Sequence, residues 1–158
     1  MEKKQPAVNQ EEETITLLGY EMIRDILIPN ILGKDTDDIL YWAGKELARK
    51  FPLSTIEDML IFFKNASFGH LTFEKEKKNQ MQFILSGSLV SARFKASTDP
   101  SFKLEAGFIA EQLQMQTSRY TEATEEIDYK KQLILITAQW DEKDTAPVDQ
   151  PDTFIKLD

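Results

Sequence analysis

HLTFEKEKKNQMQFIL, residues 70–85, is the stretch of sequence that decides the fold. Polar and apolar residues alternate along 70–75 and again along 80–85, and the apolar positions are Leu71, Phe73, Met81, Phe83 and Leu85. A period of two is the spacing of a strand that buries one face. Lys77, Lys78 and Asn79 between the two runs are typical of a turn, so the stretch predicts a β-hairpin.

Three helices are predicted before this hairpin. The first starts near Thr14, is ended or kinked by Pro29, and is closed by Gly33. Its apolar residues recur at helical spacing, whereas its charged residues occupy the other face: Leu17, Leu18, Met22, Ile26 and Leu27 against Glu21, Arg24 and Asp25. The second helix is capped by Asp35 or Thr36 and stops at Pro52. Ser54 or Thr55 caps the third, which runs to about Asn65.

Helices and strands alternate after the hairpin. A short helical piece is predicted over 89–95, and a longer helix, apolar nearly all round, over 102–117. Such a helix is buried in a core or in a partner interface. Residues 121–128 form either an edge strand or a continuation of that helix, and LILITAQW, residues 133–140, is the strongest strand and is expected to be central. The pattern predicts an α+β domain with four to five helices and a four-stranded antiparallel sheet made of two hairpins.

Composition and charge bound the function. The 158 residues carry a net charge of −8, of which residues 1–13 hold −2 and residues 141–158 hold −4. We therefore expect a disordered N-terminal segment over 1–13, one domain over 14–140 and an acidic mobile tail over 141–158. Within the tail, Phe154, Ile155 and Leu157 are apolar and are expected to dock weakly on a surface. A near-neutral body lacks the cationic surface that nucleic-acid binding needs.

The sequence is not expected to carry a targeting signal. Residues 1–13 contain no apolar core of a secretory signal, Glu2 stands where myristoylation needs glycine, and no apolar run is long enough to span a bilayer. The sequence has no cysteine, which removes disulfides, thiolate metal sites and cysteine nucleophiles. These features predict a cytoplasmic protein without stable membrane insertion.

Catalytic groups are sparse. His70 is the sole histidine and a candidate general base, but a surface or half-buried strand histidine is the plainer interpretation. Glu74 and Glu76 share one strand face as an acid–base pair would, but solvated strand carboxylates are far commoner. Asp35–Asp38 resembles a cation site but lacks the glycine and distal glutamate of an EF-hand loop, and helix capping explains it better. Gly44-Lys45 lacks the rest of a phosphate loop. We therefore predict no enzyme, no metal and no cofactor.

Two helical segments remain as candidate ligand-binding or interface sites. The first is YWAGKELARKFP, residues 41–52, and the second is LEAGFIAEQLQ, residues 104–114. Gly44 and Gly107 cost helix stability, so either close packing of another helix offsets that cost or the small residues leave room for an apolar ligand. Arg49 and Glu105 are hypothesised to form a partly buried pair. The candidate residues are Tyr41, Trp42, Gly44, Arg49, Glu105, Gly107, Phe108 and Gln112.

These two segments, together with Gln139-Trp140-Asp141, resemble the YslB-like family of uncharacterised proteins from low-GC Gram-positive bacteria, over roughly residues 20–141. More distantly the chain is similar to 4-vinyl-reductase domains and to small subunits of the TRAPP tethering complex. That resemblance implies helices packed on one face of an antiparallel sheet, frequent dimerisation through helices, and an internal channel for apolar ligands. Covalent acylation on cysteine, which TRAPP relatives use, does not apply to this chain.

The leading functional hypothesis is a non-catalytic domain that binds an apolar small molecule or a partner and acts as a homodimer. The alternative is a protein-binding adaptor without a ligand, and the third hypothesis is an enzyme that uses His70.

Overall fold

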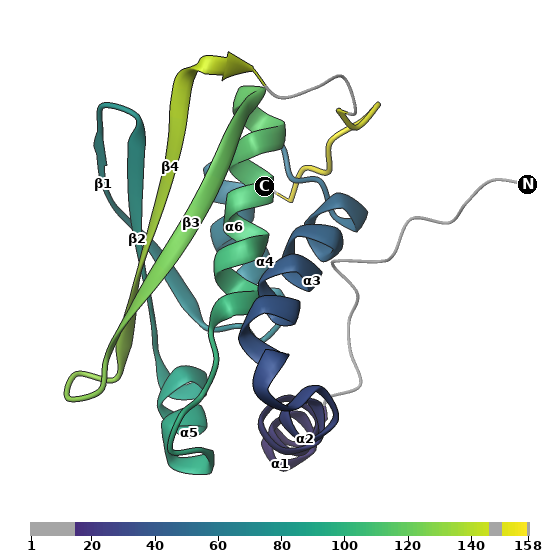
Figure 1. Ribbon diagram of the computed structural model, residues 1–158, viewed down its shortest axis with the longest axis vertical. Helices are drawn as coiled ribbons and strands as arrows, with labels where there is room; N and C mark the ends of the chain where they lie inside the picture. Colours follow the sequence, from purple (N-terminus) through teal and green to yellow (C-terminus); the bar gives the residue numbers. More distant parts are fainter. Residues whose placement is uncertain (1–14, 146–149, 158) are drawn as a thin grey trace, which may run out of the picture.

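The computed structural model describes residues 15–145 and 150–157, apart from the side chain of Asp144. Its four strands form one antiparallel sheet in the order β1-β2-β4-β3, and helices lie along one side of it (Figure 1). The predicted α+β class and the two-hairpin sheet are confirmed. The expected segment 1–13 lies outside the described residues.

The sheet joins two hairpins through its central strands. β1 (His70–Lys77) pairs with β2 (Gln80–Ser86), and β3 (Arg119–Asp128) pairs with β4 (Leu133–Thr145). β2 also pairs with β4, so β4 is central and β3 is an edge strand, which decides between the two alternatives for 121–128. The register of β1 shifts between Phe73 and Lys75, and Phe73 is 40% exposed. Phe73 still pairs with buried Phe83, with ring centroids 5.6 Å apart, and its exposure reflects the position of β1 at the edge of the sheet.

The N-terminal helical segment comprises α1 (Leu17–Glu21), the π-helical turn η1 (Met22–Leu27) and α2 (Ile28–Leu32). Pro29 does not end the helix. The N–H of Ile28 bonds to the carbonyl of Ile23, five residues back, and Pro29 then occupies the first turn of α2. A wider turn and an initial position accommodate the missing N–H of proline. Gly33, at φ 62°, ends the segment, and the 3₁₀ turn η2 (Gly33–Asp35) follows.

α3 (Thr36–Lys50) and α4 (Ile56–Asn65) have the predicted positions. Neither candidate caps α3 through its side chain, because Asp35 makes no such bond and the Thr36 hydroxyl donates to the Gly33 carbonyl. Thr55 does cap α4, since its hydroxyl accepts from the N–H of Asp58 at 3.1 Å.

α5 (Ser88–Ala96) and α6 (Lys103–Thr117) follow the first hairpin. α6 is buried nearly all round, as predicted, and lies between the sheet and α3. Contacts advance in the same direction along both helices, from Tyr41 against Gly107 to Arg49 against Glu111, so α3 and α6 run parallel. Phenylalanines from α4, from its end and from α6 fill the core beside this helix pair: Phe62, Phe63, Phe68 and Phe108.

The C-terminal end departs from the predicted boundary at residue 140. β4 continues to Thr145, where it still faces β3. Residues 150–157 make backbone contacts with the α3–α4 connection, including a bridge between Leu53 and Ile155. The strand thus extends past the predicted boundary, and the mobility of the tail stays a prediction. Ile155 and Leu157 pack against the core, in agreement with the expected docking. Within the described residues, no helix has both the length and the apolarity to cross a bilayer.

Candidate functional site

Four buried charged side chains meet beneath the N-terminal helical segment, residues 17–32, which is called the N-terminal segment from here on. Arg24 and Asp25 come from η1, Arg93 from α5 and Glu105 from the first turn of α6. Nη2 of Arg24 lies 2.7 Å from a Glu105 oxygen, and Nη2 of Arg93 lies 2.9 Å from Asp25. Nη1 of Arg93 is 3.6 Å from Glu105. Two cations and two anions thus form a neutral cluster, which we call the buried charge cluster.

The loop before α6 completes this cluster. The carbonyl oxygen of Ser101 accepts hydrogen bonds from Arg24 at 3.3 Å and from Arg93 at 2.6 Å. Tyr20 accepts a bond from Arg24 at 3.2 Å, and the guanidinium of Arg93 lies 4.3 Å from the centre of the Phe102 ring. The two arginines therefore tie the N-terminal segment, α5 and the start of α6 together, because each reaches groups from more than one element.

The charges set each other's protonation. Burial alone raises the pKa of Glu105, but Arg24 and Arg93 outweigh it and hold that pKa below its usual value. Burial lowers the pKa of Arg24, yet Glu105 more than reverses this and raises it. Burial also raises the pKa of Tyr20. Glu105 is therefore ionised at neutral pH, which suits a structural pair and does not suit a general acid.

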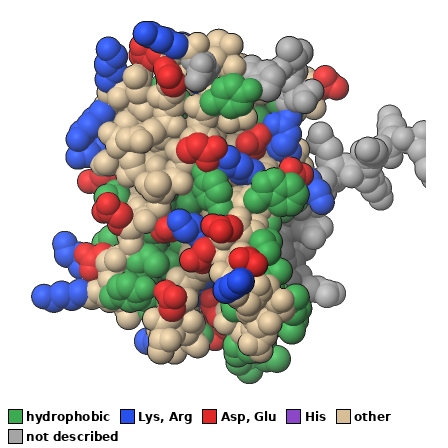
Figure 2. All heavy atoms as spheres, viewed as in Figure 1, with side chains coloured by type: hydrophobic (Ala, Val, Ile, Leu, Met, Phe, Trp, Pro, Cys, Tyr) green, Lys and Arg blue, Asp and Glu red, His purple; other side chains and the backbone are tan. Residues whose placement is uncertain are grey.

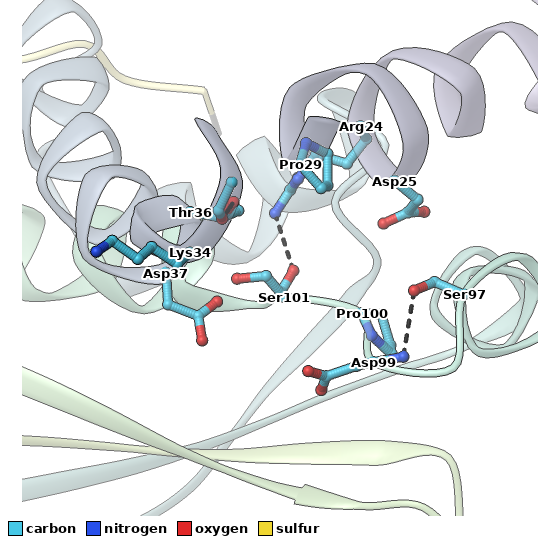
Figure 3. Close-up of a pocket in the computed structure, with 11 residues that line it drawn as sticks. Arg24, Asp25, Pro29, Lys34, Thr36, Asp37, Ser97, Asp99, Pro100 and Ser101 are labelled. Atoms are coloured by element: carbon cyan, nitrogen blue, oxygen red, sulfur yellow. Dashed lines mark hydrogen bonds between the residues drawn. The ribbon is translucent and has the colours of Figure 1, made fainter. Parts of the chain in front are cut away.

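A hollow of about 300 Å³ opens beside the buried charge cluster. In Figure 3 the N-terminal segment and the start of α3 form one wall, and the connection from Ser97 to Ser101 forms the other. Its lining is polar, with Arg24, Asp25, Lys34, Asp37 and Asp99 as the charged members. This volume is at the lower end of small-molecule sites. Among the described residues, no group of three His, Asp or Glu side chains is arranged to hold a metal ion.

The predicted glycines lie at the crossing of α3 and α6. A Cβ atom on Gly44 would lie 2.1 Å from the carbonyl oxygen of Leu104, and one on Gly107 would lie 2.0 Å from that of Tyr41. Both distances are far below contact, so the two main chains touch directly at these positions. The prediction of close helix packing is confirmed. The alternative, that the small residues leave room for an apolar ligand, is wrong at this crossing.

The aromatic candidates do not share a channel. Trp42 is on the outer side of α3 and is 63% exposed. Phe108 is fully buried, stacked on Phe62 at 4.9 Å and edge-on to Phe63 and Phe68. Rings therefore fill the space around Phe108. Tyr41, half-buried, joins α3 to β3 through bonds between its hydroxyl and both the Glu122 carboxylate and the N–H of Ala123.

The hypothesised pair of Arg49 and Glu105 is wrong. Arg49 pairs with Glu111 at 2.7 Å, and Glu105 pairs with Arg24. Because α3 and α6 run parallel, the end of α3 lies beside the second half of α6, and six helical residues separate Glu105 from Glu111 by about 9 Å. Gln112 is buried and structural: its amide accepts from the N–H of Leu53 and donates to the carbonyl of Phe51.

Sequence reasoning missed Arg93 and misplaced Arg24 and Asp25. The helical spacing of residues 17–27 separates a charged face from an apolar face, but the structure buries the charged one. The available signal was Glu105 in the apolar run of α6, since a buried carboxylate demands cationic partners. His70 is exposed at the start of β1, and no described residue hydrogen-bonds with its imidazole. Its catalytic use stays a prediction.

The apolar side of the N-terminal segment faces outward. We call its exposed side chains the outer face: Ile15, Leu17, Leu18, Met22, Ile23, Ile26, Leu27 and Ile31. Figure 2 shows hydrophobic side chains gathered at the lower end of the molecule, where α1 and α2 lie in Figure 1. Ile39 and Trp42 on α3 are exposed as well. Exposed apolar patches of this extent on soluble domains mark interaction sites.

A family model and a bacterial relative both match most of the chain. A family model described as "Protein of unknown function (DUF2507)" matches residues 17–139. The uncharacterised protein YslB of Bacillus subtilis (strain 168) is 42% identical over 136 residues, which cover 86% of this chain and 92% of that protein. The resemblance based on residues 41–52, 104–114 and 139–141 is thereby confirmed.

Two solved structures share the architecture to different degrees. A vinyl-4-reductase family protein from Methanocaldococcus jannaschii superimposes with a TM-score of 0.60 at 18% identity, covering 84% of this chain and 85% of that one. This likeness shows the fold alone. A trafficking protein particle complex subunit 3 from Naegleria fowleri, covalently bound to palmitic acid, has a TM-score of 0.48 at 13% identity, covering 82% and 92%.

Proposed function

The chain belongs to the family of proteins of unknown function DUF2507, and from this premise we propose that it is a non-catalytic interaction domain that forms a homodimer through its outer face. The observation that carries the proposal is the reversed orientation of the N-terminal segment. Its charged side is buried in the buried charge cluster, whereas its aliphatic side is exposed to solvent. A helix in this orientation buries its apolar side only when a partner covers it.

The size of the outer face supports a stable contact. Covering the exposed half of a leucine, isoleucine or methionine gains about 1 kcal/mol. Eight such side chains on each of two copies together gain on the order of 15 kcal/mol, against an association cost of roughly 4–15 kcal/mol. The balance allows association at micromolar concentration when most of the face is covered on both copies.

A second copy is the partner that the outer face fits best. A twofold interface places the same patch on both subunits, so the patch must tolerate contact with itself. The eight side chains of the outer face are apolar, so covering them with the same side chains of a second copy is favourable, although the whole chain carries −8.

The same proposal covers the remaining expectations. We infer a cytoplasmic domain without nucleic-acid partners, membrane insertion, cofactor or catalysis, in which an apolar small molecule has at most a secondary place. The close glycine crossing and the phenylalanine-filled core argue against an apolar ligand between α3 and α6. The competing hypothesis is an adaptor whose outer face binds a different protein. It predicts that the chain alone is a monomer.

Sedimentation of the full chain separates these outcomes. We expect wild type to sediment as a dimer at micromolar concentration, and the double variant Ile23→Asp/Leu27→Asp to sediment as a folded monomer, because two carboxylates in an apolar interface remain unpaired. Tyr120→Asp is the matched control: this side chain, 48% exposed on β3, is equally open but outside the outer face, and the variant should remain dimeric.

A monomeric wild type would overturn the homodimer and favour the adaptor. A dimer that survives the double substitution would place the interface elsewhere. Native mass spectrometry of the chain from its own host adds the ligand readout, since a bound apolar molecule gives a mass above that of the polypeptide.

A further inference from the structure

The described part of the C-terminal tail pairs with the α3–α4 connection. Figure 1 shows this yellow segment beside the helices and away from the sheet. Ile155 and Leu53 form a parallel bridge, in which the N–H of Ile155 donates to the carbonyl of Pro52 at 2.6 Å. The N–H of Ser54 donates to the carbonyl of Ile155 at 3.0 Å. The tail is therefore held by main-chain bonds that do not depend on side-chain identity.

Two glutamines of α6 hold the receiving edge in place. The N–H of Leu53 donates to the side-chain oxygen of Gln112 at 2.9 Å, and the carbonyl of Leu53 accepts from the side-chain amide of Gln116 at 3.0 Å. In extended backbone, neighbouring residues direct their N–H and C=O groups to opposite sides. The carbonyl of Pro52 and the N–H of Ser54 must then point away from α6. They form a short strand edge that requires an extended partner.

Asp58 supplies a third fixed contact. Its Oδ1 accepts from the N–H of Leu157 at 2.9 Å, while Oδ2 accepts from the Ser54 hydroxyl at 2.6 Å. Asp58 is fully buried in the first turn of α4. The edge and the carboxylate together bind the N–H groups of two residues that are two positions apart in an extended chain.

The side chains of residues 155–157 alternate between buried and exposed, as in a strand. Ile155 and Leu157 are partly buried and pack against the core, whereas Lys156 between them is exposed. Phe154 is 37% exposed. An extended peptide that adds to a sheet edge obtains affinity from its main chain and specificity from alternate side chains. Two aliphatic side chains at positions i and i+2 therefore face the core, and the residue between them faces solvent.

The strength of this contact suits reversible binding. Three hydrogen bonds contribute about 1 kcal/mol each, and two partly buried aliphatic side chains contribute about 1 kcal/mol each. Ordering one residue of backbone costs about 1–2 kcal/mol, and these contacts span three residues, 155–157. The two totals are of similar size. The groove residues also lie inside the family-matched range 17–139, whereas the segment that fills the groove lies beyond it.

We propose that Pro52–Ser54 and Asp58 form a peptide-binding groove and that residues 150–157 are its detachable intramolecular occupant. The intermolecular partner is an extended peptide segment with aliphatic side chains at two alternate positions. The tail competes with this partner and thereby regulates access. The site is separate from the outer face, and it does not depend on homodimerisation.

Peptide binding to the full chain tests the proposal. The variant Ile155→Asp/Leu157→Asp vacates the groove without shortening the chain, and the probe is a fluorescent synthetic peptide of residues 150–158, QPDTFIKLD. We expect saturable anisotropy with this variant. Wild type should bind roughly fivefold more weakly or worse, because its own tail is present at an effective concentration in the millimolar range. A peptide carrying the same two aspartates, or Ile155→Pro, should lose binding.

Equal binding by wild type and variant, equal binding of the altered peptides, or no binding to a folded variant would each overturn the proposal. Amide hydrogen exchange of wild type covers the case of a variant that does not fold. The N–H groups of Ile155 and Leu157 should exchange far faster than that of Ile136 in the central strand, since tail release needs no global unfolding. Exchange as slow as Ile136 would show that the tail is an integral part of the core.

Discussion

Two helical contacts hold this fold by different means. Where α3 crosses α6, glycines let the main chains touch, and the ion pair of Arg49 with Glu111 lies further along the two helices. Beneath the N-terminal segment, arginine and carboxylate groups fill the contact, and the aliphatic side chains point to solvent. The first contact is complete within one chain, whereas the second leaves an apolar surface uncovered. Charge rather than apolarity can therefore decide which side of a helix faces its own domain.

Removing a carboxylate from the buried charge cluster is the strongest way to test this comparison. We expect Glu105→Ala to lower the free energy of unfolding by about 3–5 kcal/mol, because it leaves the guanidinium of Arg24 buried without its anion. Urea unfolding measures the loss. Arg24→Ala should couple strongly to it in a double-mutant cycle, since the two side chains are in direct contact.

Arg49→Ala is the matched control for that cycle. Arg49 pairs with Glu111 and not with Glu105, so its effect should add to that of Glu105→Ala within about 0.5 kcal/mol. If Arg49 coupled to Glu105 as strongly as Arg24 does, the pairing described for the cluster would be incorrect.

The glycine crossing should be sensitive to a single methyl group. Gly107→Ala places Cβ against the backbone oxygen of Tyr41, and we expect a loss of about 2–3 kcal/mol in urea unfolding as α3 is displaced. Gly19→Ala is the control. A Cβ there meets its nearest atom, the Thr16 hydroxyl oxygen, at 3.4 Å, and alanine favours the helix by roughly 0.5–1 kcal/mol. Equal effects at the two glycines would mean that close approach does not stabilise the α3–α6 pair.

Much of the fold follows from local pattern. Period-two alternation over 70–85 predicted the first hairpin, because burial on one face imposes that spacing, and the apolar run 133–140 predicted the central strand. The strand over 121–128 stayed ambiguous because an edge strand with exposed carboxylates alternates weakly. Pro29 was expected to end or kink its helix, and only a wider turn, which local sequence does not specify, allows it to continue.

The site was less predictable than the fold. Small residues at Gly44 and Gly107 indicated contact, since glycine in mid-helix has a cost that packing must offset. The buried charge cluster depends on which of two faces of residues 17–27 turns inward, and helical spacing is the same for either choice. Glu105 and Arg49 were paired because both stand in apolar segments, whereas pairing requires the relative direction of α3 and α6.

The smallest expected effect is a pH dependence of opposite sign at two glutamates. Burial raises the pKa of Glu105, but Arg24 and Arg93 together outweigh it and lower that pKa below the ordinary 4.5. Its ionised form therefore stabilises the fold above pH 4.5, and this contribution is lost as pH falls through the folded pKa. At Glu125 on β3, burial raises the pKa more than Lys103 lowers it. That contribution is present in acid and is lost as pH rises through the folded pKa.

Substituting glutamine for Glu105 and, separately, for Glu125 tests the direction in which each carboxylate makes stability depend on pH. Urea unfolding across an acidic pH series should show Glu105→Gln furthest below wild type at neutral pH, with the gap narrowing on acidification. Glu125→Gln should gain on wild type as pH rises, because the variant lacks a carboxylate that burial disfavours. If both differences changed with pH in the same direction, the two arginines would not control the ionisation of Glu105. The contact beneath the N-terminal segment would then depend on packing, like the glycine crossing, and the two regions would no longer differ in kind.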